Sequence, residues 1–298
     1  MNRFEARRRK AQELMLEQNV AALQVTSREN YYYLTGDGRS VARLFLPQEG
    51  EPTIIVFDEE VEPAAKASEI KDVRGWRTPA QLMQNFFQLV KQYNVSEKKV
   101  GFCVHSNPGF LVYKFLRANP KMKVIENEEI LMPLRYAKDS EEIEAMKNAA
   151  EVASKGVAAA IAAVKPGITE IEVAVEAEYV MRRAGAMRYG SSTFVDSGPH
   201  SIWLHGGTSK RKIENGDLIV IDVHPVVDMY SSDCARTIVC GGANQKQNEL
   251  IQTYKDTQQN VVSSIKPGWL VGDVTKAFTA GSCGSPSSCL ACSSPPSR

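Results

Sequence analysis

Histidine is scarce and unevenly placed in this chain of 298 residues. The four histidines are His105, His200, His205 and His224, and none lies beyond residue 224. Histidine is the commonest metal ligand in proteins and the side chain whose ordinary pKa lies nearest neutral pH. A histidine ligand or a histidine acid–base group is therefore excluded from the part of the chain that follows residue 224.

Long apolar runs and a charge excess are also lacking. No stretch approaches the roughly 20 apolar residues of a membrane span, and the N-terminus lacks the apolar core of a signal peptide. The net charge is +1, which gives no support to nucleic acid or an anionic surface as partner. Cys103, Cys234 and Cys240 stand alone in strand-like segments and indicate reduced thiols. Together these features predict a cytoplasmic protein with no membrane partner.

The length predicts about two domains. Residues 1–126 alternate short apolar runs with helical patterns, which predicts an α/β domain with helices packed on a sheet. No glycine-rich phosphate loop follows any of the strands, so nucleotide binding has no support. The expected strands cover residues 20–25, 41–46, 53–57, 99–103 and 123–125, and the expected helices cover residues 4–17, 59–69, 79–94 and 107–118.

An internal repeat marks the second domain, residues 127–280, which opens with a linking stretch and a long helix near 140–164. Residues 161–167 recur as residues 262–268, and each copy ends a helical pattern at Lys-Pro-Gly. A duplicated unit of this kind buries its apolar face against its twin. The second copy has far fewer residues after it than the first, so we expect this domain to be truncated.

A helix-capping pattern follows the first copy. After the first Lys-Pro-Gly, Thr169 and Glu172 have the spacing of a capping box, and Asp273 falls where Glu172 does. Residues 281–298 differ from both copies, because they consist almost wholly of Ser, Gly, Cys and Pro. We expect a low-complexity tail there, since this composition cannot build a packed core.

The strongest chemical signal is a pair of carboxylates, Asp222 and Asp233, on the two arms of an expected β-hairpin. A turn centred between Val227 and Asp228 would place them directly opposite each other, with Cβ atoms about 4.5–5.5 Å apart. Carboxylates that close repel each other unless a cation lies between them, and divalent metals suit oxygen ligands. The alternative is a pair of solvated hairpin aspartates. His224 shares the predicted strand face of Asp222, either as a hydrogen-bonded partner or as an additional ligand.

Several segments around this hairpin carry a family resemblance. They are residues 134–143, 165–170, 197–201, 215–222 and 230–237, with Tyr33-Leu-Thr-Gly36 in the N-terminal region. Together they resemble the pita-bread metallopeptidases, which include the Xaa-Pro dipeptidases (prolidases), the Xaa-Pro aminopeptidases and the methionine aminopeptidases. The resemblance implies a creatinase/prolidase-like α/β N-terminal domain that mediates homodimer contacts. It also implies an α+β pita-bread C-terminal domain, here truncated.

The resemblance also implies an activity. Asp222 and Asp233 match the first two metal ligands of the family, and His205 matches the histidine that contacts the scissile region of the substrate. The implied reaction is cleavage of Xaa-Pro bonds in short proline-containing peptides by a metal-bound hydroxide, with two ions such as Mn²⁺ or Co²⁺. The remaining family ligands, one His and two Glu further downstream, are not found, so the chain offers two of five.

Two other functions stay open. A creatinase-like hydrolase that uses the fold without metals would rest on His205 as its base and would survive a chelator. A non-catalytic binding or dimerising protein would hold no metal and show no turnover. The other nearby histidine, His200, follows Gly198 and Pro199 and is expected to be a surface loop residue.

Overall fold

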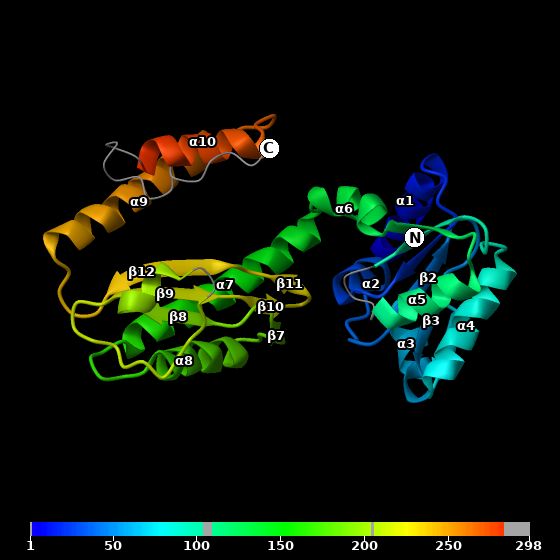
Figure 1. The fold of residues 1–298 in the computed structure, drawn as a ribbon, viewed down its shortest axis with the longest axis horizontal. Helices are drawn as coiled ribbons and strands as arrows, with labels where there is room; N and C mark the ends of the chain where they lie inside the picture. Colours follow the sequence, from blue (N-terminus) through cyan, green and yellow to red (C-terminus); the bar gives the residue numbers. More distant parts are fainter. Residues whose placement is uncertain (1, 104–108, 204–205, 283–298) are drawn as a thin grey trace. The chain divides into compact units, whose positions relative to one another are not determined.

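The computed structural model describes residues 2–103, 109–203 and 206–282. The chain forms two compact units, one ending at Ala145 and the other beginning at Met146 (Figure 1). Within the described ranges, no helix combines the length and the apolar character needed to cross a membrane.

The first unit contains a mixed six-stranded sheet in the order β4-β3-β2-β1-β5-β6. Its central strand β1 runs antiparallel to β2 and parallel to β5. The five expected strands are present, and β4 is an additional one whose half-buried, charged sequence lacks an apolar run. Its Gly75 lies so close to Asp58 that a side chain would not fit. The strands are β1 Ala22–Val25, β2 Arg43–Pro47, β3 Thr53–Phe57, β4 Asp72–Trp76, β5 Lys99–Phe102 and β6 Lys123–Glu126.

Helices cover both faces of this sheet, as the alternation of buried side chains requires. Leu44 and Leu46 of β2 face a core with α1, α2, α3 and α6. Phe45, between them, faces a second core with α4 and α5. The expected α/β layer is therefore confirmed. The helices are α1 Arg3–Glu17, α2 Arg28–Thr35, η1 Asp58–Glu60, α3 Val61–Ser68, α4 Pro79–Gln92, α5 Gly109–Ala118 and α6 Glu128–Tyr136.

The stretch that the sequence suggests as a link packs within the first unit. Helix α6 lies against α1, and the Tyr33 hydroxyl donates a hydrogen bond of 3.0 Å to the carbonyl of Leu134. The guanidinium of Arg7 lies 2.8 Å from the carboxylate of Asp139 and 3.2 Å from that of Glu142. Asp139 also caps the helix that follows, in exchange with Glu142. This stretch is thus held by specific polar contacts.

In the second unit, two helices cover one face of a three-stranded antiparallel sheet, β12-β9-β8. Alternate residues of β9 are buried on the helix side, and Asp222 lies on the opposite face. That opposite face is the one that carries the candidate site. A second small sheet has the order β11-β10-β7. The elements are α7 Ser140–Ala163, α8 Glu170–Arg183, β7 Arg188–Tyr189, β8 Phe194–Ser197, η2 Gly198–Ile202, β9 Leu218–Val223, β10 Pro225–Val227, β11 Tyr230–Ser231 and β12 Cys234–Val239.

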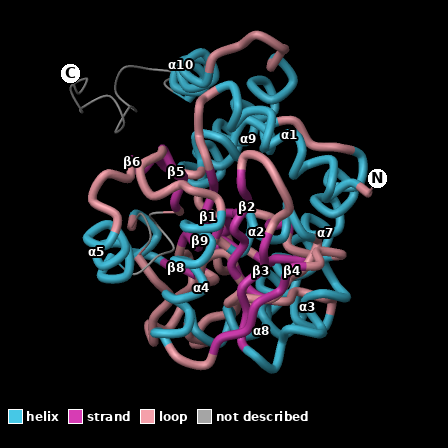
Figure 2. Tube along the Cα trace, turned by 90° about the vertical axis from the view of Figure 1, so that its right-hand side faces the viewer, coloured by secondary structure: helices cyan, strands magenta, loops and turns pink. Residues whose placement is uncertain are grey.

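The repeated Lys-Pro-Gly segments each join two helices. The first lies between α7 and α8, and the second lies between α9 (Gln245–Ser264) and α10 (Val271–Ser282). Gly167 and Gly268 both adopt positive φ, +91° and +93°, a conformation that glycine reaches without strain. Helices α9 and α10 lie side by side in both views (Figures 1 and 2). The expected tail begins inside α10, and its residues beyond Ser282 lie outside the described ranges.

Candidate metal centre

The candidate centre is built on the hairpin that joins β9–β10 to β11–β12. Its turn residues Asp228 and Met229 have φ of +46° and +69°, the signature of a two-residue type I′ turn. Val227 pairs with Tyr230 across this turn, and Val226 pairs with Ser231. The turn is therefore centred one residue later than the sequence analysis expects, because the chain reverses at Asp228–Met229.

This later turn changes which residues face each other. Asp222 pairs with Ala235, not with Asp233, so the predicted direct opposition of the two aspartates is wrong. The same register brings Asp233 opposite His224. Moving the turn centre by one residue shifts the pairing by two, and strand side chains alternate with a period of two. Asp222, His224 and Asp233 therefore stay on one face of the sheet.

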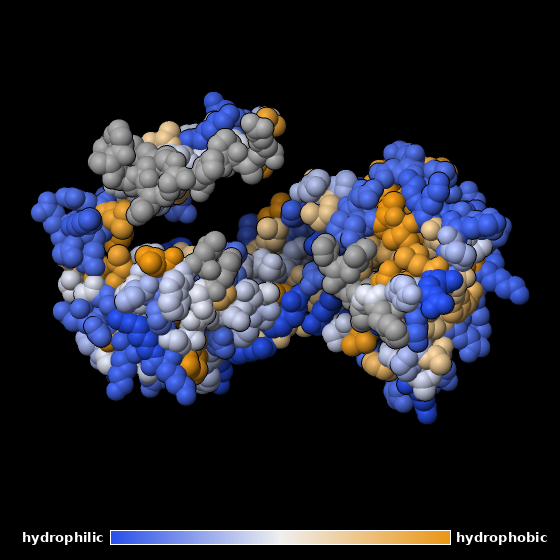
Figure 3. Space-filling model, viewed as in Figure 1, coloured by the Kyte–Doolittle hydropathy of each residue, from blue (hydrophilic) through white to orange (hydrophobic). Residues whose placement is uncertain are grey.

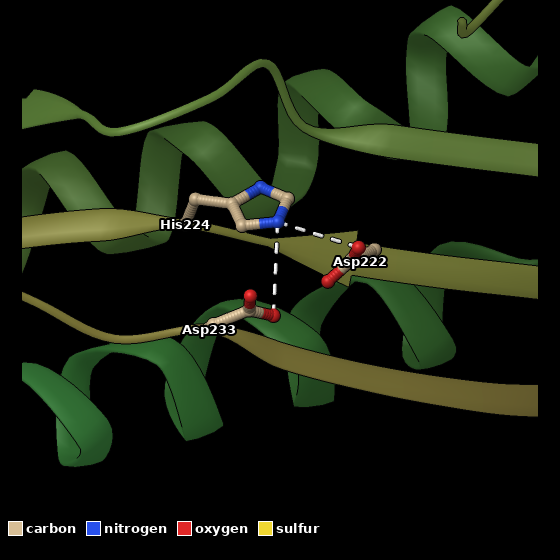
Figure 4. A group of neighbouring side chains, drawn as sticks. All are labelled: Asp222, His224 and Asp233. Carbon is tan, nitrogen blue, oxygen red and sulfur yellow. Dashed lines mark ion pairs between the residues drawn. The ribbon is translucent and has the colours of Figure 1, made fainter. Parts of the chain in front are cut away.

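These three side chains converge (Figure 4). His224 Nε2 lies 3.3 Å from Asp222 Oδ2 and 3.7 Å from Asp233 Oδ1. One ligand atom from each residue lies within 4.8 Å of the others. The Asp233 side chain is 82% exposed, whereas Asp222 and His224 are partly buried. The cluster is thus open to solvent on the side of Asp233.

The imidazole of His224 is held from behind. Its Nδ1 lies 3.1 Å from the carbonyl oxygen of Ser192, and Phe194 meets the ring edge-on at 5.8 Å between centroids. A carbonyl oxygen can only accept, so Nδ1 carries the proton and Nε2 is left to face the two carboxylates. Metal-bound histidines show this same support of the outer nitrogen.

The electrostatics of Asp222 suit a cation. Its Oδ1 is buried and has no hydrogen-bond partner. Burial raises the pKa of Asp222 above its ordinary value, His224 lowers it, and the nearby Asp233 raises it. An unpartnered buried carboxylate oxygen is costly, and a metal ion satisfies it. Two carboxylates and one imidazole fit a divalent metal ion.

The other predicted histidines have different outcomes. His205 lies outside the described residues. His200 is not the surface loop residue that the sequence suggests, because its ring is partly buried and its Nδ1 lies 3.1 Å from Oε1 of Glu170. Glu170 is fully buried at the start of α8. The sequence analysis missed Glu170, since a glutamate in the first turn of a helix reads as an ordinary helix-start residue.

A pocket of about 600 Å³ lies between α8 and residues 189–193. Ile171, Ala174 and Val175 of α8 form its apolar wall, and residues 189–193 with Thr208 form the other side. Ser192, whose carbonyl holds His224, is among the lining residues. The pocket and the three-residue cluster therefore share one connecting loop.

Comparison with known proteins assigns the family. Residues 144–280 match the model described as metallopeptidase family M24, and residues 7–137 match the creatinase/prolidase N-terminal domain. The Xaa-Pro dipeptidase of Pyrococcus horikoshii is 30% identical over 257 residues, which cover 86% of this chain and 70% of that protein. The Xaa-Pro dipeptidase of Pyrococcus furiosus is 29% identical, with 85% and 70% covered.

Solved structures agree with this assignment. The prolidase of Pyrococcus horikoshii superposes with a TM-score of 0.81 at 28% identity, over 93% of this chain and 77% of that one. A prolidase of Thermococcus sibiricus superposes with a TM-score of 0.85 at 25% identity, over 94% and 77%. These similarities confirm the creatinase-type N-terminal domain and the pita-bread fold. The chain therefore belongs to metallopeptidase family M24, an assignment that implies divalent metal ions.

Proposed function

We propose that this chain is a metal-dependent peptidase that cleaves the bond before proline in short Xaa-Pro peptides. The observation that carries the proposal is the convergence of Asp222, His224 and Asp233 on one sheet face. Two relatives named Xaa-Pro dipeptidases support the substrate class. Divalent ions, Mn²⁺ or Co²⁺, would polarise the peptide carbonyl and activate a water when bound there.

Each residue of the cluster has a part that follows from its surroundings. Asp222 offers a buried oxygen that nothing else satisfies. Asp233 is exposed and can close on an ion from the solvent side. His224 presents Nε2 because Ser192 holds its other nitrogen. We propose that His205 donates a hydrogen bond to the scissile region, as the family motif implies.

A second candidate function is binding without turnover. Among the described residues the cluster offers three donor side chains. Divalent ions that prefer oxygen ligands take about six ligands. Three donors therefore leave about half of the coordination positions to water or to other groups. A chain with only this set would bind an ion weakly and would not hold two ions in the geometry that hydrolysis needs. The alternative predicts sparse metal binding and no cleavage.

The test compares the full wild-type chain with the variant Asp222→Asn. Two quantities are measured for each: the number of bound metal ions per chain and the rate of Ala-Pro and Leu-Pro cleavage. The proposal predicts about two Mn²⁺ per wild-type chain after dialysis, measured by elemental mass spectrometry, with the ligand set completed by groups outside this cluster. It also predicts loss of metal and of cleavage in the variant. Asp228→Asn is the matched control, because it removes the same charge at a positive φ that Asn tolerates. Unchanged cleavage by Asp222→Asn would rule out the metal assignment. Sparse metal binding together with no cleavage in the wild type would favour the second candidate.

A further inference from the structure

Among the described residues of the second unit outside the metal cluster, Glu170 is the acid with the most hydrogen bonds. Its side chain is fully buried, yet it accepts hydrogen bonds from five donors. Oε1 accepts from the Ser197 amide at 2.8 Å, the Ser197 hydroxyl at 2.7 Å and His200 Nδ1 at 3.1 Å. Oε2 accepts from the Ser209 amide at 3.0 Å and the Ser209 hydroxyl at 2.6 Å. A carboxylate is acceptor-only, which is why it can satisfy so many donors.

These donors come from two stretches of chain, one that runs from the end of β8 into η2 and one that contains Ser209. Ser197 ends β8, His200 lies in η2, and Ser209 belongs to the segment that returns after residue 205. A backbone hydrogen bond also joins the start of α8 to the stretch that contains Ser209, because the Glu170 amide donates to the carbonyl of Arg211 at 3.1 Å. One carboxylate thus ties the start of α8 to the end of β8, to η2 and to Ser209.

The contact also fixes the ring of His200. Because the carboxylate accepts only, Nδ1 carries the proton and a neutral ring keeps Nε2 as an acceptor. Trp203 stacks on the same ring at 3.9 Å between centroids and 19° between planes. The His200 side chain is 18% exposed. Its orientation is therefore held both by a hydrogen bond and by an aromatic surface.

This tied region borders the candidate centre. Strand β8 pairs with β9, with Phe194 opposite Asp222 and Asp196 opposite Val220. Asp196, next to Ser197, is buried on the same sheet face as Asp222, and its Oδ1 has no hydrogen-bond partner. A shift of β8 or η2 would therefore move groups that line the face where a substrate would lie.

We propose that Glu170 is a positioning residue, whose carboxylate fixes the Nδ1 proton of His200 and holds β8 and η2 beside the Asp222 face. The kinetic part of this inference rests on the proposed peptidase activity. The imidazole part does not, because a ring's protonation pattern can be observed without turnover. The two parts can therefore fail separately.

The test replaces Glu170 by Gln in the full chain. The Gln side chain keeps one acceptor oxygen, but an NH₂ group replaces the other oxygen. That NH₂ group would face the amide and hydroxyl donors of Ser197 or of Ser209. Glu172→Gln is the matched control, since Glu172 lies in the same helix turn, is exposed, and Gln preserves its capping box with Thr169. Long-range ¹H–¹⁵N spectra of ¹⁵N-histidine-labelled protein, assigned through His200→Gln, read the protonated nitrogen. Cleavage is normalised to bound Mn²⁺, which separates positioning from loss of folded sites.

We expect His200 to carry its proton on Nδ1 in the wild type and in Glu172→Gln, and to lose that preference in Glu170→Gln. We also expect kcat to fall on the order of 10–100-fold in Glu170→Gln, with KM changed far less. A wild-type ring protonated on Nε2 alone overturns the inference. So does a Glu170→Gln variant whose spectrum and kcat equal those of Glu172→Gln. If Glu170→Gln does not fold, Ser209→Ala removes one donor and should give the same shift in smaller degree; an unchanged ring and kcat there also overturn it.

Discussion

The two helix pairs of the second unit, α7–α8 and α9–α10, have the same local design but different burial. At equivalent positions, Ala149 and Ala153 of α7 are fully buried, while Leu250 and Tyr254 of α9 are 47% and 49% exposed. In Figure 3, a small group of hydrophobic residues lies at the surface in the region of α9, beside hydrophilic ones. The larger apolar side chains thus lie in the less buried pair.

The difference separates what local sequence determines from what packing determines. Helix ends and the Lys-Pro-Gly turn depend on nearby residues, so both pairs form them. Burial depends on a partner surface. The first pair packs on β8 and β9, which follow it in the chain. Within the described residues, no strand covers the corresponding face of the second pair. Exposed apolar side chains gathered in this way mark a surface suited to interaction.

The largest expected effect comes from placing the same charge at equivalent positions. Val173 of α8 is fully buried, and Val274 of α10 is partly exposed. We expect Val173→Asp to lower the free energy of unfolding by about 3 kcal/mol or more, because it buries an unpaired charge. Val274→Asp should cost less than about 1 kcal/mol. Urea unfolding of both variants measures the difference, and equal losses would mean that α10 is buried in solution.

A smaller effect is expected from acid. Burial raises the pKa of Glu170, but the hydrogen bonds from Ser209 and Ser197 lower it more, so it lies below the ordinary value. A depressed folded-state pKa gives stability that is present above the unfolded value, about 4.3 for Glu, and is lost as pH falls through the folded value. The equivalent residue of the second pair is Val271. Acid should therefore destabilise the first pair.

Unfolding midpoints measured from pH 7 down to about pH 3 test this expectation. Below the ordinary Glu pKa, the wild type should lose stability more steeply than Glu170→Gln, which has no charge to lose. Glu172→Gln serves as the comparison. Hydrogen bonds with Thr169 also lower the pKa of Glu172, but its side chain is exposed, so its removal should change the acid profile far less than that of Glu170. Parallel pH profiles for the wild type and Glu170→Gln would show that this carboxylate does not determine acid stability.

Much of the fold could be predicted from the sequence because its signals are local. The capping pair Thr169–Glu172 and the repeated Lys-Pro-Gly turns lie where the residue spacing places them. The apolar strands of the first unit are equally recognisable. Strand β4 could not be recognised in this way, because it is held in the sheet by parallel pairing with β3 and not by apolar residues of its own. Pairing of that kind is a tertiary property.

The candidate site divides in the same way. Asp222 and Asp233 were placed on one face correctly, because strand alternation survives a shift of two residues. Their direct opposition was wrong, because Met229 adopts a positive φ that non-glycine residues seldom adopt. The hydrogen bond between Glu170 and His200 could not be predicted. The two residues are thirty positions apart, and only the packing of α8 against β8 and η2 brings them together.

The smallest expected effect concerns the first turns of α8 and α10. Thr169 accepts from the Glu172 amide and completes a capping box, whereas Leu270 stands at the equivalent position and has no side-chain acceptor. Asp273 still accepts from the Leu270 amide. Thr169→Ala should cost about 1 kcal/mol. Leu270→Thr should add a few tenths to about 1 kcal/mol, because Leu270 is 71% exposed and loses little burial. Urea unfolding compares the two, and a loss of stability in Leu270→Thr would show that its side chain is covered in solution. A gain in stability would mean that the first turn of α10 lacks a side-chain cap that α8 already has. The two helix pairs would then form in the same way and differ in the surfaces that cover them.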